Sequence, residues 1–68
     1  MNYPRIKQMR KHLGKTQSEI ADVLFITQQQ YSLYESGKRE FPVSYLPILA
    51  KFYGVTTDYL LGLTDKQN

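Results

Sequence analysis

The sequence predicts an all-α fold in which five short helices pack as one compact domain. Glycines stand at intervals that suit helix ends, at Gly14, Gly37, Gly54 and Gly62. Two capping-box patterns, over residues 16–19 and 27–30, indicate helix starts. Between these signals apolar residues recur three and four positions apart, which is the spacing of one helix face.

The size of the chain limits what it can contain. Its 68 residues, of which 41% are hydrophobic, suffice for one core and are too few for a two-domain enzyme. We expect a single domain over residues 1–63 and a frayed C-terminal tail over residues 64–68. Because so small a core leaves little stability to spare, a partner that covers apolar surface, such as a second copy or DNA, would stabilise it.

The first helix is expected to begin after Asn2 and to end at Gly14. Pro4 falls in its opening turn, where the missing N–H of proline does no harm. The side chains that follow at helical spacing are Ile6, Met9, Arg10 and Leu13.

Two helices separated by a very short gap are expected next. The hydroxyl of Thr16 can accept from the backbone N–H of Glu19, so one helix opens at Gln17. Its apolar face holds Ile20, Ala21 and Leu24. Thr27, with a glutamine three positions later, repeats the capping pattern and opens a helix that ends at Gly37. So short a connection requires a sharp turn.

Two further helices complete the domain. Ser44 is the expected N-cap of the fourth helix, which ends at Gly54 and has Pro47 at its third position. Thr56 is the expected N-cap of a last short helix, which ends at Gly62.

The charge distribution favours an anionic partner. The formal net charge is +3. Residues 1–15 hold no acid and contain the bases Arg5, Lys7, Arg10, Lys11 and Lys15. The chain has no cysteine, which excludes a disulfide and a Cys/His zinc site. No stretch approaches the roughly 18–20 apolar residues of a membrane span, so we expect a cytoplasmic protein with no membrane contact.

No pattern points to catalysis. His12 is the single histidine and has no carboxylate near it in the sequence. The six carboxylates form neither a metal-ligand cluster nor a calcium-loop pattern, and there is no glycine-rich phosphate loop. We therefore expect neither an enzyme nor a bound cofactor or metal.

Residues 17–37 combine a capped helix, a tight turn and a second capped helix, which predicts helix-turn-helix geometry. The major groove of DNA admits one helix, and a glutamine near its start can pair with N6 and N7 of adenine. Glutamines occupy residues 28–30, and two helix N-termini close together suit phosphate. The residues alone also fit a solvated helix start for these glutamines and an ordinary charged turn for Lys38 and Arg39.

Motifs at fixed spacing point to a known family. They are Gln17-Ser18-Glu19-Ile20-Ala21, Ile26-Thr27, Glu35-Ser36-Gly37-Lys38-Arg39, Leu49-Ala50-Lys51, Gly54-Val55-Thr56 and Asp58-Tyr59-Leu60-Leu61-Gly62. Over residues 5–62 the chain resembles the helix-turn-helix repressor family of lambdoid phage repressors, Cro proteins and XRE-like bacterial regulators. The resemblance implies a compact lambda-repressor-like domain whose second and third helices form the helix-turn-helix.

The same resemblance implies roles for individual residues. Base contacts would fall to Gln28 and Gln29, with secondary candidates Thr27, Gln30, Ser32 and Leu33. Phosphate contacts would fall to Gln17, Lys38 and Arg39, and to Ser36, which could reach either bases or phosphate. Arg10 and Glu35 occupy positions that form a buried ion pair in some members, and a phosphate contact is the alternative role for Arg10.

Three residues depart from the family pattern. Phe25 stands where glycine is usual in the turn, so a left-handed backbone would be strained there unless the turn has another shape. Tyr31 replaces a smaller core residue, and its ring either enlarges the core or brings its hydroxyl to a phosphate. Pro47 would shorten the fourth helix.

The leading functional hypothesis is a sequence-specific regulator of transcription, a repressor that binds double-stranded DNA as a homodimer on an inverted repeat. The rival hypothesis is a protein-interaction module, antitoxin-like or adaptor-like, that grips an unidentified protein partner. The surface expected to serve a dimer or such a partner comprises Tyr45, Phe52, Tyr53, Tyr59, Leu60 and Leu63. For Phe52 and Leu60, plain core packing is the default expectation.

Overall fold

The computed structural model describes residues 3–68, and the five expected helices are present over this part of the chain. They are α1 (Pro4–His12), α2 (Gln17–Leu24), α3 (Gln28–Glu35), α4 (Tyr45–Tyr53) and α5 (Thr57–Leu61). No strand occurs between residues 3 and 68, so the predicted all-α fold class is confirmed. The expected start of the first helix after Asn2 borders on Met1 and Asn2, which lie outside the described residues.

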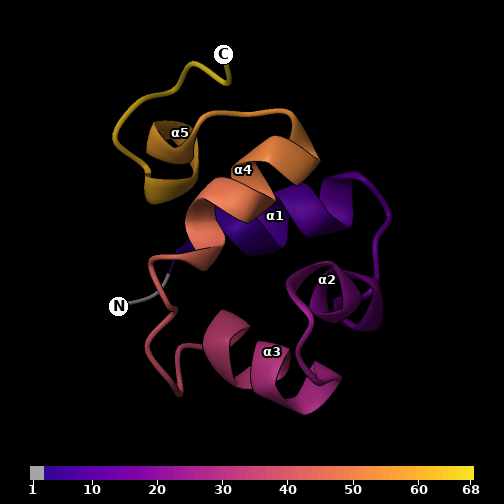
Figure 1. Ribbon diagram of the computed structural model, residues 1–68. Coiled ribbons are helices and arrows are strands. Elements are labelled where there is room, and N and C mark those ends of the chain that lie inside the picture. Colours follow the sequence, from indigo (N-terminus) through magenta and orange to yellow (C-terminus); the bar gives the residue numbers. More distant parts are fainter. Residues whose placement is uncertain (1–2) are drawn as a thin grey trace.

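Helix α1 connects the two halves of the domain. It contacts α3 on one side and α5 on the other, while α2 packs against α3 and α4 packs against α5 (Figure 1). The described residues extend over 30 × 23 × 18 Å. The α2–α3 pair therefore stands on one side of α1 (Figure 1). At the two helix starts, Ser18, Gln28 and Gln29 are exposed and Gln17 is half-buried.

The core consists mostly of the side chains that the helical spacing placed on one face of each helix. The exception is Leu13, which follows the last residue of α1 and is 44% exposed. The largest fully buried side chains are Ile6, Ile20, Tyr31, Leu46, Leu49 and Leu60. Every helix contributes at least one of them. Burying a side chain of this size stabilises the fold by about 1.5–3 kcal/mol before the entropy of ordering is subtracted.

An aromatic group closes the core at the connection between α3 and α4. Phe41 is buried there, and the rings around it belong to Tyr3, Tyr31, Tyr34 and Tyr45. We call these five residues the Phe41 cluster. The ring centroids of Tyr34 and Tyr31 lie 5.8 and 6.4 Å from that of Phe41, and most of the pairs meet edge to face. The connection between α3 and α4 has no helical hydrogen bonds around Phe41, and this cluster packs it onto the helices.

The helix starts follow the predicted caps with one correction. The hydroxyls of Thr16, Thr27 and Thr56 each accept a backbone N–H three residues later, as predicted. Ser44 also occupies the N-cap position of α4, but its side chain makes no capping hydrogen bond. Its backbone is already helical at φ −62° and ψ −21°, whereas capping needs an extended backbone. Pro47 lies at the third helical position, and α4 continues through it to Tyr53.

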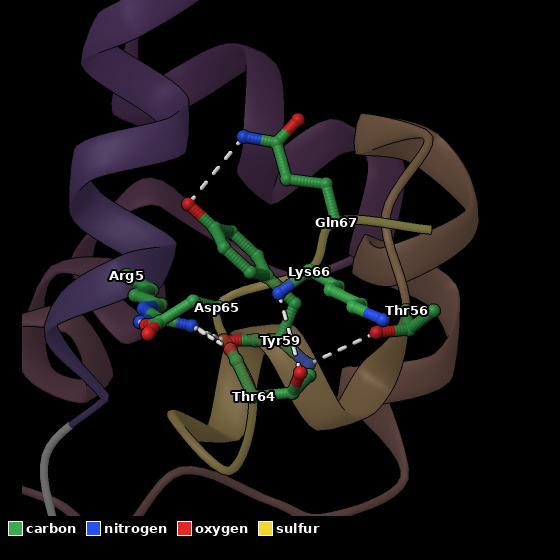
Figure 2. Close-up of polar contacts among 7 residues, drawn as sticks. All are labelled: Arg5, Thr56, Tyr59, Thr64, Asp65, Lys66 and Gln67. Carbon is green, nitrogen blue, oxygen red and sulfur yellow. Dashed lines mark hydrogen bonds and ion pairs between the residues drawn. The ribbon is translucent and has the colours of Figure 1, made fainter.

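Residues 64–67 belong to the C-terminal tail, for which we expect fraying, and they lie against α1 and α5 (Figure 2). The Arg5 guanidinium donates to the carbonyl oxygen of Tyr59 at 3.0 Å, to that of Thr64, and to the Asp65 carboxylate at 2.7 Å. The same guanidinium lies 4.3 Å from the centre of the Tyr59 ring. The N–H of Thr56 donates to the carbonyl oxygen of Gln67 at 2.8 Å.

Candidate nucleic-acid interface

The starts of α2 and α3 present free backbone donors. In each helix the capping threonine satisfies the third N–H, at 3.1 Å in both cases. The N–H groups of Gln17 and Ser18 in α2 and of Gln28 and Gln29 in α3 have no acceptor within residues 3–68. These N–H groups carry the positive end of each helix dipole, which favours an anion such as phosphate.

Phe25 sets the geometry between the two helices. Its backbone is left-handed, with φ 58° and ψ 41°, so the turn keeps the shape that glycine usually provides. The N–H of Phe25 donates to the carbonyl oxygen of Asp22, and that of Ile26 donates to the carbonyl oxygen of Ala21 at 3.0 Å. The Phe25 side chain is 95% exposed. A strained and solvent-exposed aromatic residue therefore forms this turn.

The glutamine side chains at the start of α3 differ in whether they are hydrogen-bonded within the protein. The Oε1 atom of Gln30 accepts from the N–H and the hydroxyl of Thr27, at 3.1 and 3.3 Å, so these two residues hold the helix start. Gln28 and Gln29 are exposed, and their side chains make no hydrogen bond within the described residues. Ser32 and Leu33, one turn further along, are half-buried. Gln28 and Gln29 are thus the free amides at this end of α3.

Arg10 and Glu35 form a buried ion pair between α1 and α3. The Arg10 guanidinium donates from Nε to Oε2 of Glu35 at 2.9 Å and from Nη2 to Oε1 at 2.8 Å. The Tyr31 hydroxyl donates to Oε2 at 2.6 Å, and Nε2 of Gln17 donates to Oε1 at 3.2 Å. Glu35 is 7% exposed and receives donors from three elements. This contact places the Tyr31 hydroxyl in the core, away from any phosphate.

The protonation of this network follows from its contacts. Burial alone raises the pKa of the Glu35 carboxyl, but the hydrogen bonds from Arg10, Tyr31 and Gln17 outweigh it and hold the pKa below its ordinary value. The hydrogen bond to Glu35 raises the pKa of Arg10. Burial, followed by the hydrogen bond to Glu35, raises the pKa of Tyr31 far above its ordinary value. At neutral pH the network therefore holds one carboxylate and one guanidinium.

The predicted phosphate contacts that follow α3 are at the surface. Ser36, Lys38 and Arg39 are exposed, and the Ser36 hydroxyl donates to the carbonyl oxygen of Leu33 at 3.2 Å. The backbone N–H of Arg39 donates to the same oxygen at 3.1 Å, which fixes the chain just after the helix. Both basic side chains add positive charge at the surface just after the end of α3.

The expected partner surface needs a correction. Tyr53 and Leu60 are 7% and 1% exposed, because α4 and α5 turn these faces toward the core, so neither residue can line a surface. Phe52 is 42% exposed and Leu63 is 73% exposed, so the core default for Phe52 is wrong. Tyr45 is half-buried in the Phe41 cluster, and Tyr59 is half-buried under the Arg5 guanidinium. Sequence reasoning did not anticipate this role of Arg5, because its partners lie more than 50 residues away.

Within residues 3–68, no three histidine, aspartate or glutamate side chains gather so that they could hold a metal ion. None of the helices described is long and apolar enough to cross a bilayer.

Comparison with known proteins gives consistent matches over most of the chain. A family described as helix-turn-helix matches residues 6–60. The transcriptional regulator YobD of Bacillus subtilis is 39% identical over 61 residues, which cover 90% of this chain and 54% of the relative. The SPbeta prophage-derived regulator YonR of the same organism is 43% identical over 63 residues, covering 93% and 58%. ImmR, also from Bacillus subtilis and described as an HTH-type transcriptional regulator, is 41% identical over 58 residues, covering 85% and 46%. The chain spans about half the length of these curated relatives.

Proposed function

Because the chain belongs to the helix-turn-helix family, we propose that it is a transcriptional regulator that binds double-stranded DNA with α3 in the major groove. One observation carries the proposal: Gln28 and Gln29 are exposed, have free amides and stand at a helix start that a capping box fixes. A glutamine amide can donate to N7 of adenine and accept from its N6 amino group at the same time. The two residues are therefore the proposed base contacts.

The remaining contacts are assigned by their place around α3. Leu33 and Ser32, one turn further along, are proposed as secondary contacts to a thymine methyl group and to bases or phosphate. Phosphate contacts are proposed for Gln17 at the start of α2, and for Ser36, Lys38 and Arg39 after α3. In this scheme Thr27 and Gln30 hold the helix start in shape.

The proposed mode of action is repression by a homodimer in the cytoplasm of a bacterium or of a phage-infected cell. A dimer on an inverted repeat would place its two recognition helices about 34 Å apart, which is one turn of the duplex. Occupancy of such an operator would block polymerase. The exposed side chains of Phe52 and Leu63 are proposed as part of the dimer contact.

The test is selection of bound sequences from a random pool of short duplexes at moderate salt. We expect an inverted repeat with half-sites one helical turn apart to be enriched. The double variant Gln28→Ala, Gln29→Ala should lose this preference, by about 1–3 kcal/mol for each base pair no longer recognised, and keep non-specific binding. With roughly 4–6 phosphates neutralised per dimer, the slope of log affinity against log salt should be about −4 to −5.

Other outcomes of the selection would favour the rival function. The proposal would be contradicted if the folded protein enriched no sequence and its weak affinity for DNA did not depend on salt concentration. The exposed apolar side chains of Phe52, Ile48 and Leu63 would then favour a protein-interaction module. If the double variant bound every duplex as the parent does, the assignment of base contacts to these glutamines would be wrong.

A further inference from the structure

The side chain of Gln17 is linked to the buried ion pair. Its Nε2 atom donates to Oε1 of Glu35 at 3.2 Å, across the α2–α3 packing. The acceptor is a carboxylate only 7% exposed, and Arg10 holds it at 2.8 and 2.9 Å. Gln17 itself is half-buried and occupies the first position of α2, beside the free N–H groups at that helix start.

We propose that Glu35 is a positioning residue, which orients the Gln17 amide for a phosphate of the DNA backbone. This inference rests on the proposed function, since it assumes that Gln17 faces DNA. The Nε2 group of glutamine has two hydrogens, and the bond to Glu35 occupies one of them. The second hydrogen and the backbone N–H of Gln17 remain available to one phosphate oxygen.

The benefit of this arrangement is preorganisation. A free glutamine side chain loses rotamer entropy when it is immobilised at an interface, at roughly 0.5–1.5 kcal/mol. Because Glu35 already fixes the Gln17 amide in the unbound protein, that entropy is lost on folding and not again on binding. The phosphate contact is then stronger than one made by an unanchored glutamine.

Because of Arg10, the Glu35 carboxylate can hold Gln17 without repelling a nearby phosphate. A bare carboxylate beside a phosphate would repel it. The bidentate contact with Arg10 neutralises the Glu35 charge, and the Tyr31 hydroxyl satisfies the remaining acceptor position. The pair that joins α1 to α3 thereby also supports the contact between α2 and DNA.

The test is a double-mutant cycle on the affinity for a random-sequence duplex of about 20 base pairs at low salt. Phosphate contacts do not depend on sequence, so no operator is needed. The variants are Gln17→Ala, the apolar replacement Arg10→Met with Glu35→Leu, and the combination of the three substitutions. We expect Gln17→Ala to weaken binding by about five- to tenfold in the wild-type background and by less than about twofold in the apolar background.

Tyr31→Phe is the matched control. It removes one of the donors to the same carboxylate, on Oε2, and leaves the bond from Gln17 to Oε1 in place. We expect this variant to be less stable and to bind the duplex within about twofold of wild type. Equal losses on Gln17→Ala in both backgrounds, or a loss on Tyr31→Phe as large as that of the apolar pair, would overturn the proposal.

A second measurement applies if the apolar replacement does not fold. In the NMR spectrum of the wild-type protein, the two Nε2 protons of Gln17 are identified by their absence in Gln17→Ala. On addition of the duplex we expect one of the two resonances to shift and the one bonded to Glu35 to stay in place. Displacement of both would contradict positioning by Glu35. If the wild-type protein binds no duplex at all, the proposed function fails first, which is a distinct result.

Discussion

At the scale of single residues, Phe25 combines backbone strain with an exposed apolar ring. A left-handed backbone is unfavourable for a residue with a Cβ atom by roughly 1–2 kcal/mol, and the ring is 95% exposed and contributes no packing. Both features lie in the turn that sets the start of α3. Strain that the surrounding structure maintains is most often found at functional sites.

We predict that Phe25→Gly stabilises the protein. Glycine adopts φ 58° without strain, and its greater freedom in the unfolded chain offsets only part of the gain. The net effect should be about 0.5–1 kcal/mol, which corresponds to a rise of about 2–8 °C in the thermal midpoint. Phe25→Ala keeps the Cβ atom and is the control, with no rise expected. A lower midpoint for Phe25→Gly would mean that the ring stabilises the fold.

The buried carboxylate of Glu35 predicts a dependence of stability on acid. Its pKa is lower in the folded state than the ordinary value of 4.5. The ionised form therefore stabilises the fold above about pH 4.5, and this contribution is lost as the pH falls through the lower, folded pKa. Urea unfolding at pH 7, 5 and 3.5 measures this effect. Between pH 5 and 3.5 the free energy of unfolding should fall more for wild type than for the double variant Arg10→Met with Glu35→Leu. Parallel losses in the two proteins would assign the acid sensitivity to other carboxylates.

At the scale of elements, the sequence predicts helix starts well where a side chain makes the cap. Thr16 and Thr27 each have their partner three residues later, so the signal and the contact are the same residues. For α4 the position of the N-cap, Ser44, was predicted correctly, but the expected side-chain hydrogen bond is absent. A turn from Pro42 to Tyr45 continues directly into the helix instead. The sequence does not distinguish a serine that caps from one whose backbone is already helical.

We predict that the cap of α3 stabilises the element proposed to meet DNA. Thr27→Ala removes the acceptor for the Gln30 N–H and should reduce the free energy of unfolding by about 1 kcal/mol. Thr27→Ser keeps a hydroxyl at the same place and should retain most of this stability. Chemical denaturation measures both. Equal losses for the two variants would point to the methyl group of Thr27 and not to its hydroxyl.

At the scale of the whole molecule, the features that could not be predicted are contacts between distant segments. The resemblance to the helix-turn-helix family is confirmed, as is the all-α fold, because short-range motifs carry both. The bond from Gln17 to Glu35 spans 18 residues, and those from Arg5 to the tail span up to 60. Periodicity within a helix carries no information about such pairs. Tyr53 is a different case: it follows Leu46, Leu49 and Ala50 at helical spacing and is buried with them, so its assignment to a partner surface went against the periodicity.

We predict that Arg5 holds the tail chiefly through backbone contacts and the Tyr59 ring. The Asp65 side chain is 99% exposed, so Asp65→Ala should change the free energy of unfolding by less than about 0.5 kcal/mol. Arg5→Ala also removes hydrogen bonds to the carbonyl oxygens of Tyr59 and Thr64 and the cation–π contact, and should lower it by about 1–2 kcal/mol. Similar small effects from both substitutions would indicate that the tail frays in solution, as the sequence predicts.

The Phe41 cluster also gives the protein an internal spectroscopic reporter. The chain has no tryptophan, so its near-ultraviolet circular dichroism arises mainly from tyrosines, of which the cluster holds four. Those rings surround Phe41, which lies in the connection between α3 and α4, outside any helix. The far-ultraviolet signal reports helix content, whereas the near-ultraviolet signal reports how firmly the tyrosine rings pack around Phe41. Comparing the two during denaturation would separate helix melting from loosening of the core.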